Sequence, residues 1–347
     1  MLDTQGMLTA TWELPEQMEQ AAAIVSGESG LDGFCPKNGF DNVVILGMGG
    51  SAMAGEVAQA VAYNKTAVPL NVVRNYLPPC FIGPTSLVIA VSFSGNTEET
   101  LEAVQRSVQA GASLISITTG GKLAKLADRL KAPLIQLPTE IPQPRAGLGA
   151  MLVSILLSLK QVGLLDEVEE WILGTVEHLK TKRNRLFNQP SELARRIGSN
   201  IPLIYGAEPL GAVAAKRWKA QFNENSKTPA FCSSYPELCH NELAGWGQNG
   251  DITRQIITLI QLHSGHEHPQ VETRFGLVSD ILQETVADII EVRAEGEDKG
   301  ELAQLLDLIF IGDLVSVYLA YNLGVDPGPI PVLDEIKVKL QKTATAT

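Results

Sequence analysis

The sequence predicts an α/β protein with two tandem domains, each a mostly parallel, doubly wound sheet flanked by helices. Between residues 42 and 138, short apolar runs alternate with helix-like segments. Residues 146–196 then have a helical pattern, and the alternation restarts at residue 201. Strands that alternate with helices at this spacing indicate right-handed crossovers between parallel strands.

The elements follow from these patterns in order. An amphipathic helix is predicted at residues 9–25, ahead of a glycine-rich loop. In the first domain, apolar runs favour strands at 42–46, 70–76, 86–94, 113–120 and 133–138, and helices after residue 47 and at 99–111 and 122–130. In the second, we expect strands at 201–206, 255–263 and 288–296 and helices at 212–222, 271–282 and 301–324.

We therefore divide the chain into four parts. They are an N-terminal helix and loop (1–40), a first domain (41–150), a helical linker (151–198) and a second domain with C-terminal helices (199–347). The tail from Asp326 is a proline-rich turn that leads into a last helix.

Composition limits the partners. The net charge of −12 argues against nucleic acid or an anionic membrane, which bind basic surfaces. No signal-peptide pattern and no run of eighteen apolar residues is present, so we expect a cytoplasmic protein. Four cysteines without CxxC spacing, predicted to be free thiols, fit a reducing compartment: Cys35, Cys80, Cys232 and Cys239.

Two turns at strand ends predict a phosphate site in the first domain. Residues 47–55 (GMGGSAMAG) place glycines where the N–H groups of a helix N-terminus face an anion, and residues 92–100 (SFSGNTEET) add short hydroxyl side chains. Together they would hold a phosphate monoester. The predicted binding residues are Gly50, Ser51, Ser92, Ser94 and Thr97.

Two other interpretations apply to these turns. Gly47, Gly49 and Ala52 formally satisfy the dinucleotide pattern GxGxxA, and Arg74 could bind a 2′-phosphate. However, a dinucleotide site has no use for the serine-rich turn, and the second strand ends without the usual acidic residue. Merely tight connections would explain the glycines but not the serines.

A polar segment at residues 216–246 is typical of a site for proton transfer on an anionic substrate. It contains Glu224, His240 and several cations, without the apolar stripe of an ordinary surface helix. Arg145 follows the fifth predicted strand, at the sheet edge where ligands bind. Taken singly, each of the three side chains could also be a solvated or structural residue.

Several motifs resemble a known family. GGSAMAG and SFSGNTEET resemble the sugar isomerase (SIS) domain, and PRAGLG, NENSK and PELCHNELAGW are similar to the bifunctional phosphoglucose/phosphomannose isomerases, which have two SIS domains. The resemblance covers about residues 40–340. It implies an isomerase that interconverts glucose 6-phosphate and mannose 6-phosphate with fructose 6-phosphate through a cis-enediol, without a cofactor.

The resemblance also implies roles for single residues. Glu224 would transfer the proton, Arg145 would stabilise the enediolate, and His240 would open the sugar ring from across a dimer interface. The active unit would then be at least a homodimer. A C-terminal lysine, Lys337 or the nearby Lys339, would contact the substrate.

One motif departs from the family pattern. Residues 326–329 read DPGP where DPTP is expected, so Gly328 replaces a threonine. We expect the pocket to gain space and lose a hydroxyl contact, which would affect the balance between glucose and mannose substrates.

Alternative functions remain open. They are a phosphosugar sensor without catalysis, an amino-sugar phosphate isomerase, which is normally fused to a glutaminase domain, and an NADP oxidoreductase. A metal site is not expected: His263, His266 and His268 lie in a loop and are predicted to be solvated, and the spacing of Cys232 and Cys239 matches no common zinc motif.

Overall fold

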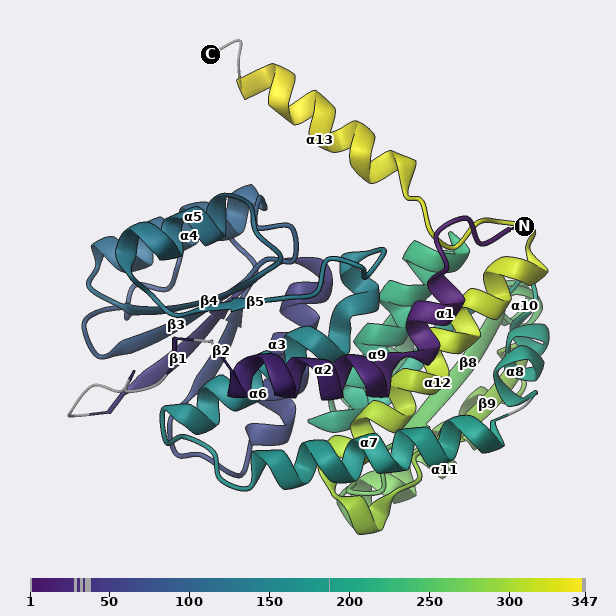
Figure 1. The fold of residues 1–347 in the computed structure, drawn as a ribbon. Coiled ribbons are helices and arrows are strands. Elements are labelled where there is room, and N and C mark those ends of the chain that lie inside the picture. The colour runs from purple at the N-terminus through teal and green to yellow at the C-terminus, as the bar shows by residue number, and fades with distance from the viewer. Residues whose placement is uncertain (1, 28–29, 32–33, 35–38, 187, 345–347) are drawn as a thin grey trace.

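The computed structural model describes residues 2–27, 30–31, 34, 39–186 and 188–344, and contains two parallel sheets (Figure 1). The first sheet has the strand order β2-β1-β3-β4-β5 and the second β7-β6-β8-β9. The strands are β1 (Asn42–Leu46), β2 (Leu70–Val73), β3 (Ser86–Val91), β4 (Ser113–Thr118), β5 (Leu134–Gln136), β6 (Ile201–Ala207), β7 (Phe231–Tyr235), β8 (Ile257–His263) and β9 (Asp288–Arg293). The predicted α/β class with two parallel sheets is confirmed.

Helices surround both sheets (Figure 1). They are α1 (Met7–Trp12), α2 (Leu14–Ser26), α3 (Gly49–Ala62), α4 (Glu98–Gln109), α5 (Gly121–Leu130), α6 (Leu148–Gln161), α7 (Val168–Arg185), α8 (Gln189–Ile197), α9 (Leu210–Gln221), α10 (Gly250–Ile256), α11 (Pro269–Leu282), α12 (Glu301–Asn322) and α13 (Pro331–Ala344).

The first sheet is covered on both faces, as its apolar strands require. Every residue of β3 is buried, and successive side chains point to opposite faces. Ile89 packs in the cluster that contains side chains of α2, α3 and α6, whereas Val88 packs with those of α4 and α5.

One apolar core connects the two sheets. Ile204 of β6 and Ile260 of β8 belong to the same cluster as Ile89, together with side chains of α9 and α12. The opposite face of the second sheet packs against α11, where Leu259 meets Phe275. The long helix α12 therefore lies at the centre of the second half, between its sheet and the N-terminal helices (Figure 1).

Burial in the protein core explains the apolar composition of α12. Its length and hydropathy would allow it to cross a membrane, but 94% of its most apolar window is buried inside the protein. A helix that is apolar on all sides is expected where protein surrounds it.

Several described elements differ from the sequence prediction. Helix α10 was not expected, and it includes residues 255–256, which the prediction places in a strand. Strand β7, with the sequence FCSSY, was not predicted, because it is an edge strand that pairs with β6 and carries little apolar alternation. The predicted helix at 9–25 is two helices that meet at Glu13. Pro15 lies in the first turn of α2, where its missing N–H costs no hydrogen bond.

Close packing between α9 and α12 gives a stability prediction. A Cβ atom on Gly312 would overlap the indole of Trp218, whose Nε1 donates to the Leu308 carbonyl oxygen at 2.8 Å. We expect Gly312→Ala to lower the free energy of unfolding by about 1–3 kcal/mol through overpacking. Gly174→Ala in α7 is the control, because its Cβ would meet Lys299 at an ordinary 3.7 Å. Urea midpoints that fall equally in both variants would contradict this account.

Candidate active site

The predicted phosphate site lies where the first sheet changes its direction of winding. Strands β1 and β3 are neighbours, and the chain leaves their carboxyl ends toward opposite sides, into α3 and α4. In open parallel sheets the crevice at this point binds ligands. Both predicted turns, 47–55 and 92–100, begin at this edge, directly after β1 and β3.

Hydrogen bonds connect the hydroxyl side chains of the two turns. The buried Ser51 hydroxyl accepts from the Phe93 backbone N–H at 3.4 Å, and the Ser92 hydroxyl donates to Thr97 Oγ1 at 3.0 Å. Thr97 lies at the start of α4, while Ser94 is exposed. The N-termini of α3 and α4 thus stand beside one cluster of hydroxyl groups, which is an arrangement suited to a phosphate.

Glycine is required at two positions of this cluster. Gly95 has a φ of +66°, and a Cβ there would overlap the Gly120 carbonyl oxygen. A Cβ on Gly50 would lie 3.1 Å from the Arg145 Cα, so the first turn of α3 packs directly on the backbone of Arg145. The structure thus brings Gly50, Ser51 and Arg145 together from segments about a hundred residues apart.

Arg145 is buried in the short helix η1 (Pro144–Gly147), with each guanidinium nitrogen beside an acceptor. Its Nε donates to Asn225 Oδ1 at 2.7 Å, and its Nη2 donates to the carbonyl oxygens of Pro327 and Gly328, both at 2.6 Å. Its Nη1 lies 3.7 Å from Glu224 Oε2. Burial lowers the pKa of Arg145, and the Glu224 carboxylate opposes this effect.

A buried ion pair supports the backbone of Arg145. Arg217 of α9 makes two hydrogen bonds to Asp313 of α12, at 2.9 and 2.6 Å, and its Nη2 also donates to the Arg145 carbonyl oxygen at 2.7 Å. Burial raises the pKa of Asp313, whereas the charge of Arg217 opposes this. This pair links α9, α12 and η1 at one point.

Glu224 lies in η2 (Phe222–Ser226), a π-helical turn that extends α9 and places its carboxylate near Arg145. Its side chain is 29% exposed, which leaves room for contact with a ligand. Lys227 closes the turn, because its ammonium donates to the carbonyl oxygens of Glu224 and Asp326 at 2.9 and 2.7 Å. Burial and the charge of Arg145 lower the pKa of Lys227.

His240 and Glu224 lie at opposite ends of the second sheet. Asn223, next to Glu224, accepts a hydrogen bond from the Ala230 N–H, just before β7 begins. The five residues of β7 then rise about 16 Å before the chain reaches η3 (Glu237–His240). The exposed His240 is therefore separated from Glu224 of its own chain by roughly the length of the strand.

The C-terminal lysines belong to α13, which extends away from the two sheets (Figure 1). The Lys337 side chain is outside those that the structure describes. Lys339 pairs with Glu335 at 2.6 Å on the exposed helix surface. Within the described side chains, the structure therefore brings no C-terminal lysine to Arg145.

The histidine-rich turn after β8 is organised around a carboxylate. Glu267 accepts hydrogen bonds from the Ser264 hydroxyl and the Gly265 N–H, both at 2.8 Å, and also from the Ser264 N–H. This turn is the topological equivalent of the turn after β3, because both strands adjoin the first strand of their sheet. In the second half, the Glu267 carboxylate accepts the hydrogen bonds from the backbone N–H groups of this turn.

The prediction that all three histidines of this turn are solvated is wrong for His263. Its ring is buried, lies 3.2 Å from Glu272 and packs against Phe275. His268 instead accepts from the Gln270 N–H at the start of α11. Among the described residues, no group of three or more His, Cys, Asp or Glu side chains could hold a metal ion.

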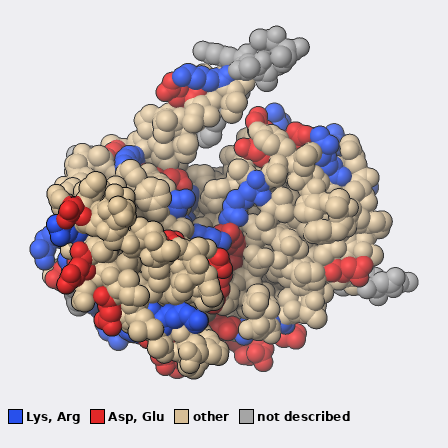
Figure 2. Space-filling model, turned by 180° about the vertical axis from the view of Figure 1, so that it is seen from behind, with Lys and Arg blue, Asp and Glu red and all other residues tan. Residues whose placement is uncertain are grey.

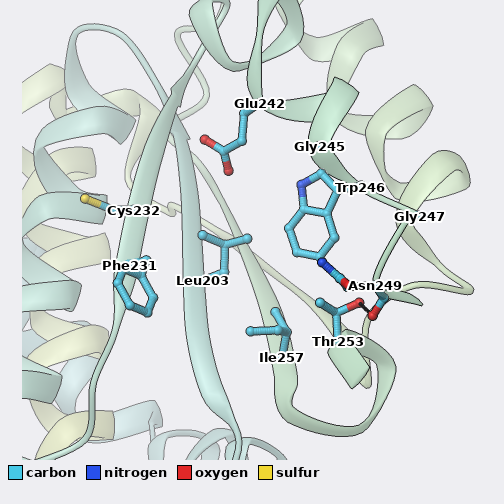
Figure 3. Close-up of a pocket in the computed structure, with 10 residues that line it drawn as sticks. All are labelled: Leu203, Phe231, Cys232, Glu242, Gly245, Trp246, Gly247, Asn249, Thr253 and Ile257. Atoms are coloured by element: carbon cyan, nitrogen blue, oxygen red, sulfur yellow. Dashed lines mark hydrogen bonds between the residues drawn. The ribbon is translucent and has the colours of Figure 1, made fainter. Parts of the chain in front are cut away.

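A separate apolar pocket of about 510 Å³ lies beside β6 and β7 (Figure 3). Glu242 enters it and accepts a hydrogen bond from the Tyr205 hydroxyl, whose pKa is raised by burial and by this carboxylate. The pocket is lined by Leu203, Phe231, Cys232, Glu242, Gly245, Trp246, Gly247, Asn249, Thr253 and Ile257. None of the predicted catalytic residues is among them.

Sequence reasoning missed four residues that hold Arg145: Gln143, Arg217, Asn225 and Asp313. A signal was present for Asp313, since it is one of two acids, with Asp307, within the apolar sequence of α12. A buried acid requires a charged or hydrogen-bonding partner. Arg217, in the apolar helix α9, could have been proposed as that partner from the sequence.

The two parallel α/β halves, with two helix N-termini beside one cluster of hydroxyl groups, define a protein of the SIS class. The model of the bacterial phospho-glucose isomerase C-terminal SIS domain matches residues 187–340. The chain is 35% identical to a bifunctional phosphoglucose/phosphomannose isomerase of Caldicellulosiruptor bescii, over 96% of this chain and 98% of that protein. It belongs to the bifunctional phosphoglucose/phosphomannose isomerase family.

A second relative supports the family assignment, and a solved structure shows the same fold. A second relative with the same name, from Aquifex aeolicus, is 36% identical over 88% of this chain and 92% of its own length. The fold is similar to the C-terminal domain of glucosamine-fructose-6-phosphate aminotransferase from Francisella tularensis, with a TM-score of 0.68, 17% identity and coverage of 94% of this chain and 98% of that one.

The buried pair behind Arg145 gives a second prediction. Arg217→Met leaves Asp313 buried without its cation, which should cost about 3–5 kcal/mol of unfolding free energy. The double variant Arg217→Met/Asp313→Leu removes both charges and should recover most of that loss. Guanidinium denaturation measures both. A double variant as unstable as the single one would contradict the charge-pair explanation.

Proposed function

We propose that this protein is an aldose–ketose isomerase that interconverts glucose 6-phosphate and mannose 6-phosphate with fructose 6-phosphate. The observation that carries the proposal is the position of Arg145, whose backbone touches the predicted phosphate cradle and whose guanidinium lies 3.7 Å from Glu224. The predicted phosphate site, a carboxylate and a fixed cation thus adjoin one another. The names of the relatives from C. bescii and A. aeolicus support the same reaction.

In this proposal the cradle holds the phosphate through Gly50, Ser51, Ser92, Ser94 and Thr97. Glu224 removes the proton from C2 of the open-chain aldose and returns it to C1, while the hydroxyl proton at C2 moves to the oxygen at C1. Negative charge develops on oxygen in the enediolate. Arg145, held by hydrogen bonds on Nε and Nη2, presents Nη1 to this charge with little reorganisation.

The reaction rearranges hydrogen within one sugar and needs no external oxidant or reductant, so we propose no cofactor. Ring opening requires proton transfer between the ring oxygen and the anomeric hydroxyl. We assign this step to His240, because an imidazole side chain can both accept and donate a proton. We assign a substrate contact to Lys337.

We further propose a homodimer in which each active site receives His240 from the partner chain. The exposure of His240 and its separation from Glu224 by the length of β7 support this arrangement. Helix α13 projects from the body of the molecule (Figure 2). Its side chains Val332, Ile336 and Leu340 are exposed and form an apolar surface that a second copy could cover. The free thiols Cys80, Cys232 and Cys239 agree with a cytoplasmic location.

The central test is Glu224→Gln. It should retain phosphosugar binding and lose at least about a thousandfold in turnover, because the amide cannot accept the C2 proton. Proton NMR of fructose 6-phosphate in D₂O with EDTA follows both aldoses and the deuterium at C2. The exposed Glu284→Gln serves as the surface control. Full turnover by Glu224→Gln would remove Glu224 from the mechanism, and binding without turnover by the unmodified protein would instead indicate a phosphosugar sensor.

The shared site can be tested by mixing two inactive variants. Glu224→Gln and His240→Ala chains, denatured and refolded together, should form mixed dimers with one intact site each. Activity should then return to about one quarter of the unmodified level, since half of the dimers are mixed in random pairing. A mixture as inactive as its components would place His240 and Glu224 of one site on the same chain, whereas a His240→Ala variant that is active by itself would put His240 outside the mechanism.

A further inference from the structure

The N-terminal segment contacts the turn that holds Arg145. The Thr4 hydroxyl donates to Asp326 Oδ2 at 2.6 Å, and the Asp3 carboxylate accepts from the Met7 and Leu8 N–H groups and from the Tyr321 hydroxyl. These bonds fix the residues on both sides of Gln5. The Gln5 side chain is exposed, so packing in the core does not explain its position.

Gln5 fills the space beside Gly328. A Cβ on Gly328 would lie 2.9 Å from the Cβ, Cγ and Oε1 atoms of Gln5. The φ of Gly328 is outside the left-handed region, so its backbone does not demand glycine. The expected gain of pocket space at this position is therefore wrong, because the missing side chain is replaced by that of Gln5.

Gln5 also determines how Gln143 faces Arg145. Gln143 Nε2 donates to Gln5 Oε1 at 2.7 Å, and Gln143 Oε1 accepts from Arg145 Nη1 at 3.3 Å. A guanidinium has only donors, so Gln143 must present its oxygen to Arg145. An acceptor at position 5 favours this orientation of the amide over the flipped one. Nη1 is the nitrogen next to Glu224.

We propose that Gln5 is a positioning residue, which acts through Gln143 to hold Arg145 Nη1 beside Glu224, and that Gly328 is small in order to admit it. The inference rests on the proposed isomerase function. Because the phosphate site lies on other residues, loss of Gln5 should affect turnover more than substrate binding. The substitution Gln5→Glu keeps an acceptor for Gln143 and should preserve this arrangement.

The first experiment compares Gln5→Ala, Gln5→Glu and the control Gln20→Ala, an exposed glutamine of α2. We expect Gln5→Ala to lower kcat for fructose 6-phosphate by about 3- to 10-fold, the size of one hydrogen bond, with KM changed less than about twofold. Gln5→Glu and Gln20→Ala should keep kcat within about twofold. A Gln5→Ala kcat equal to that of the unmodified protein, or a Gln5→Glu variant equally impaired, would overturn the proposal.

A second experiment tests the pairing with Gly328. Gly328→Ala should displace Gln5 and lower kcat in the otherwise unmodified protein. In a Gln5→Gly background, the same substitution should cause no further loss, because the conflicting side chain is absent. An equal fold loss in both backgrounds would show that Gly328 acts independently of Gln5.

The two proposals can fail separately. An unmodified protein that does not interconvert the sugar phosphates would reject the isomerase function, and with it the role of Gln5. An active protein in which Gln5→Ala is unimpaired would reject only the role of Gln5.

Discussion

The buried pair between Arg217 and Asp313 is the constraint on which the candidate site depends. It joins α9 to α12, and its third hydrogen bond holds the carbonyl oxygen of Arg145. Two charges inside an apolar core are tolerated only when their hydrogen bonds are satisfied in one geometry. The position of η1 is thereby fixed against both helices. The guanidinium of Arg145 then has a defined place between the predicted phosphate site and Glu224.

Much of this site was predictable from local sequence. Glycines and serines at the ends of apolar strands indicated the cradle, and the alternation of strands and helices predicted two parallel sheets. Arg145 and Glu224 stood out in short motifs, and the structure places them 3.7 Å apart. The role of each residue in catalysis stays a prediction.

What the sequence could not predict depends on contacts between distant segments. Strand β7 lacks an apolar pattern because one of its edges is unpaired in the sheet. Gln5 and Gly328 are 323 positions apart, and although Gly328 departs from the family pattern, nothing in the sequence near it indicates Gln5 as its neighbour. Only the folded chain reveals that a side chain near the N-terminus occupies the space left by a glycine near the C-terminus. The π-helical turn at Glu224 likewise has no clear local signature.

The Glu267 carboxylate marks a difference between the two halves of the molecule. The halves repeat one strand arrangement, yet in the second the turn that corresponds to the cradle already contains an anion supplied by the chain. An external phosphate could enter only by expelling that side chain. In the second half the equivalent turn is therefore closed by the chain's own side chain, and the residues that this half would contribute to the proposed site, Glu224 and His240, lie elsewhere.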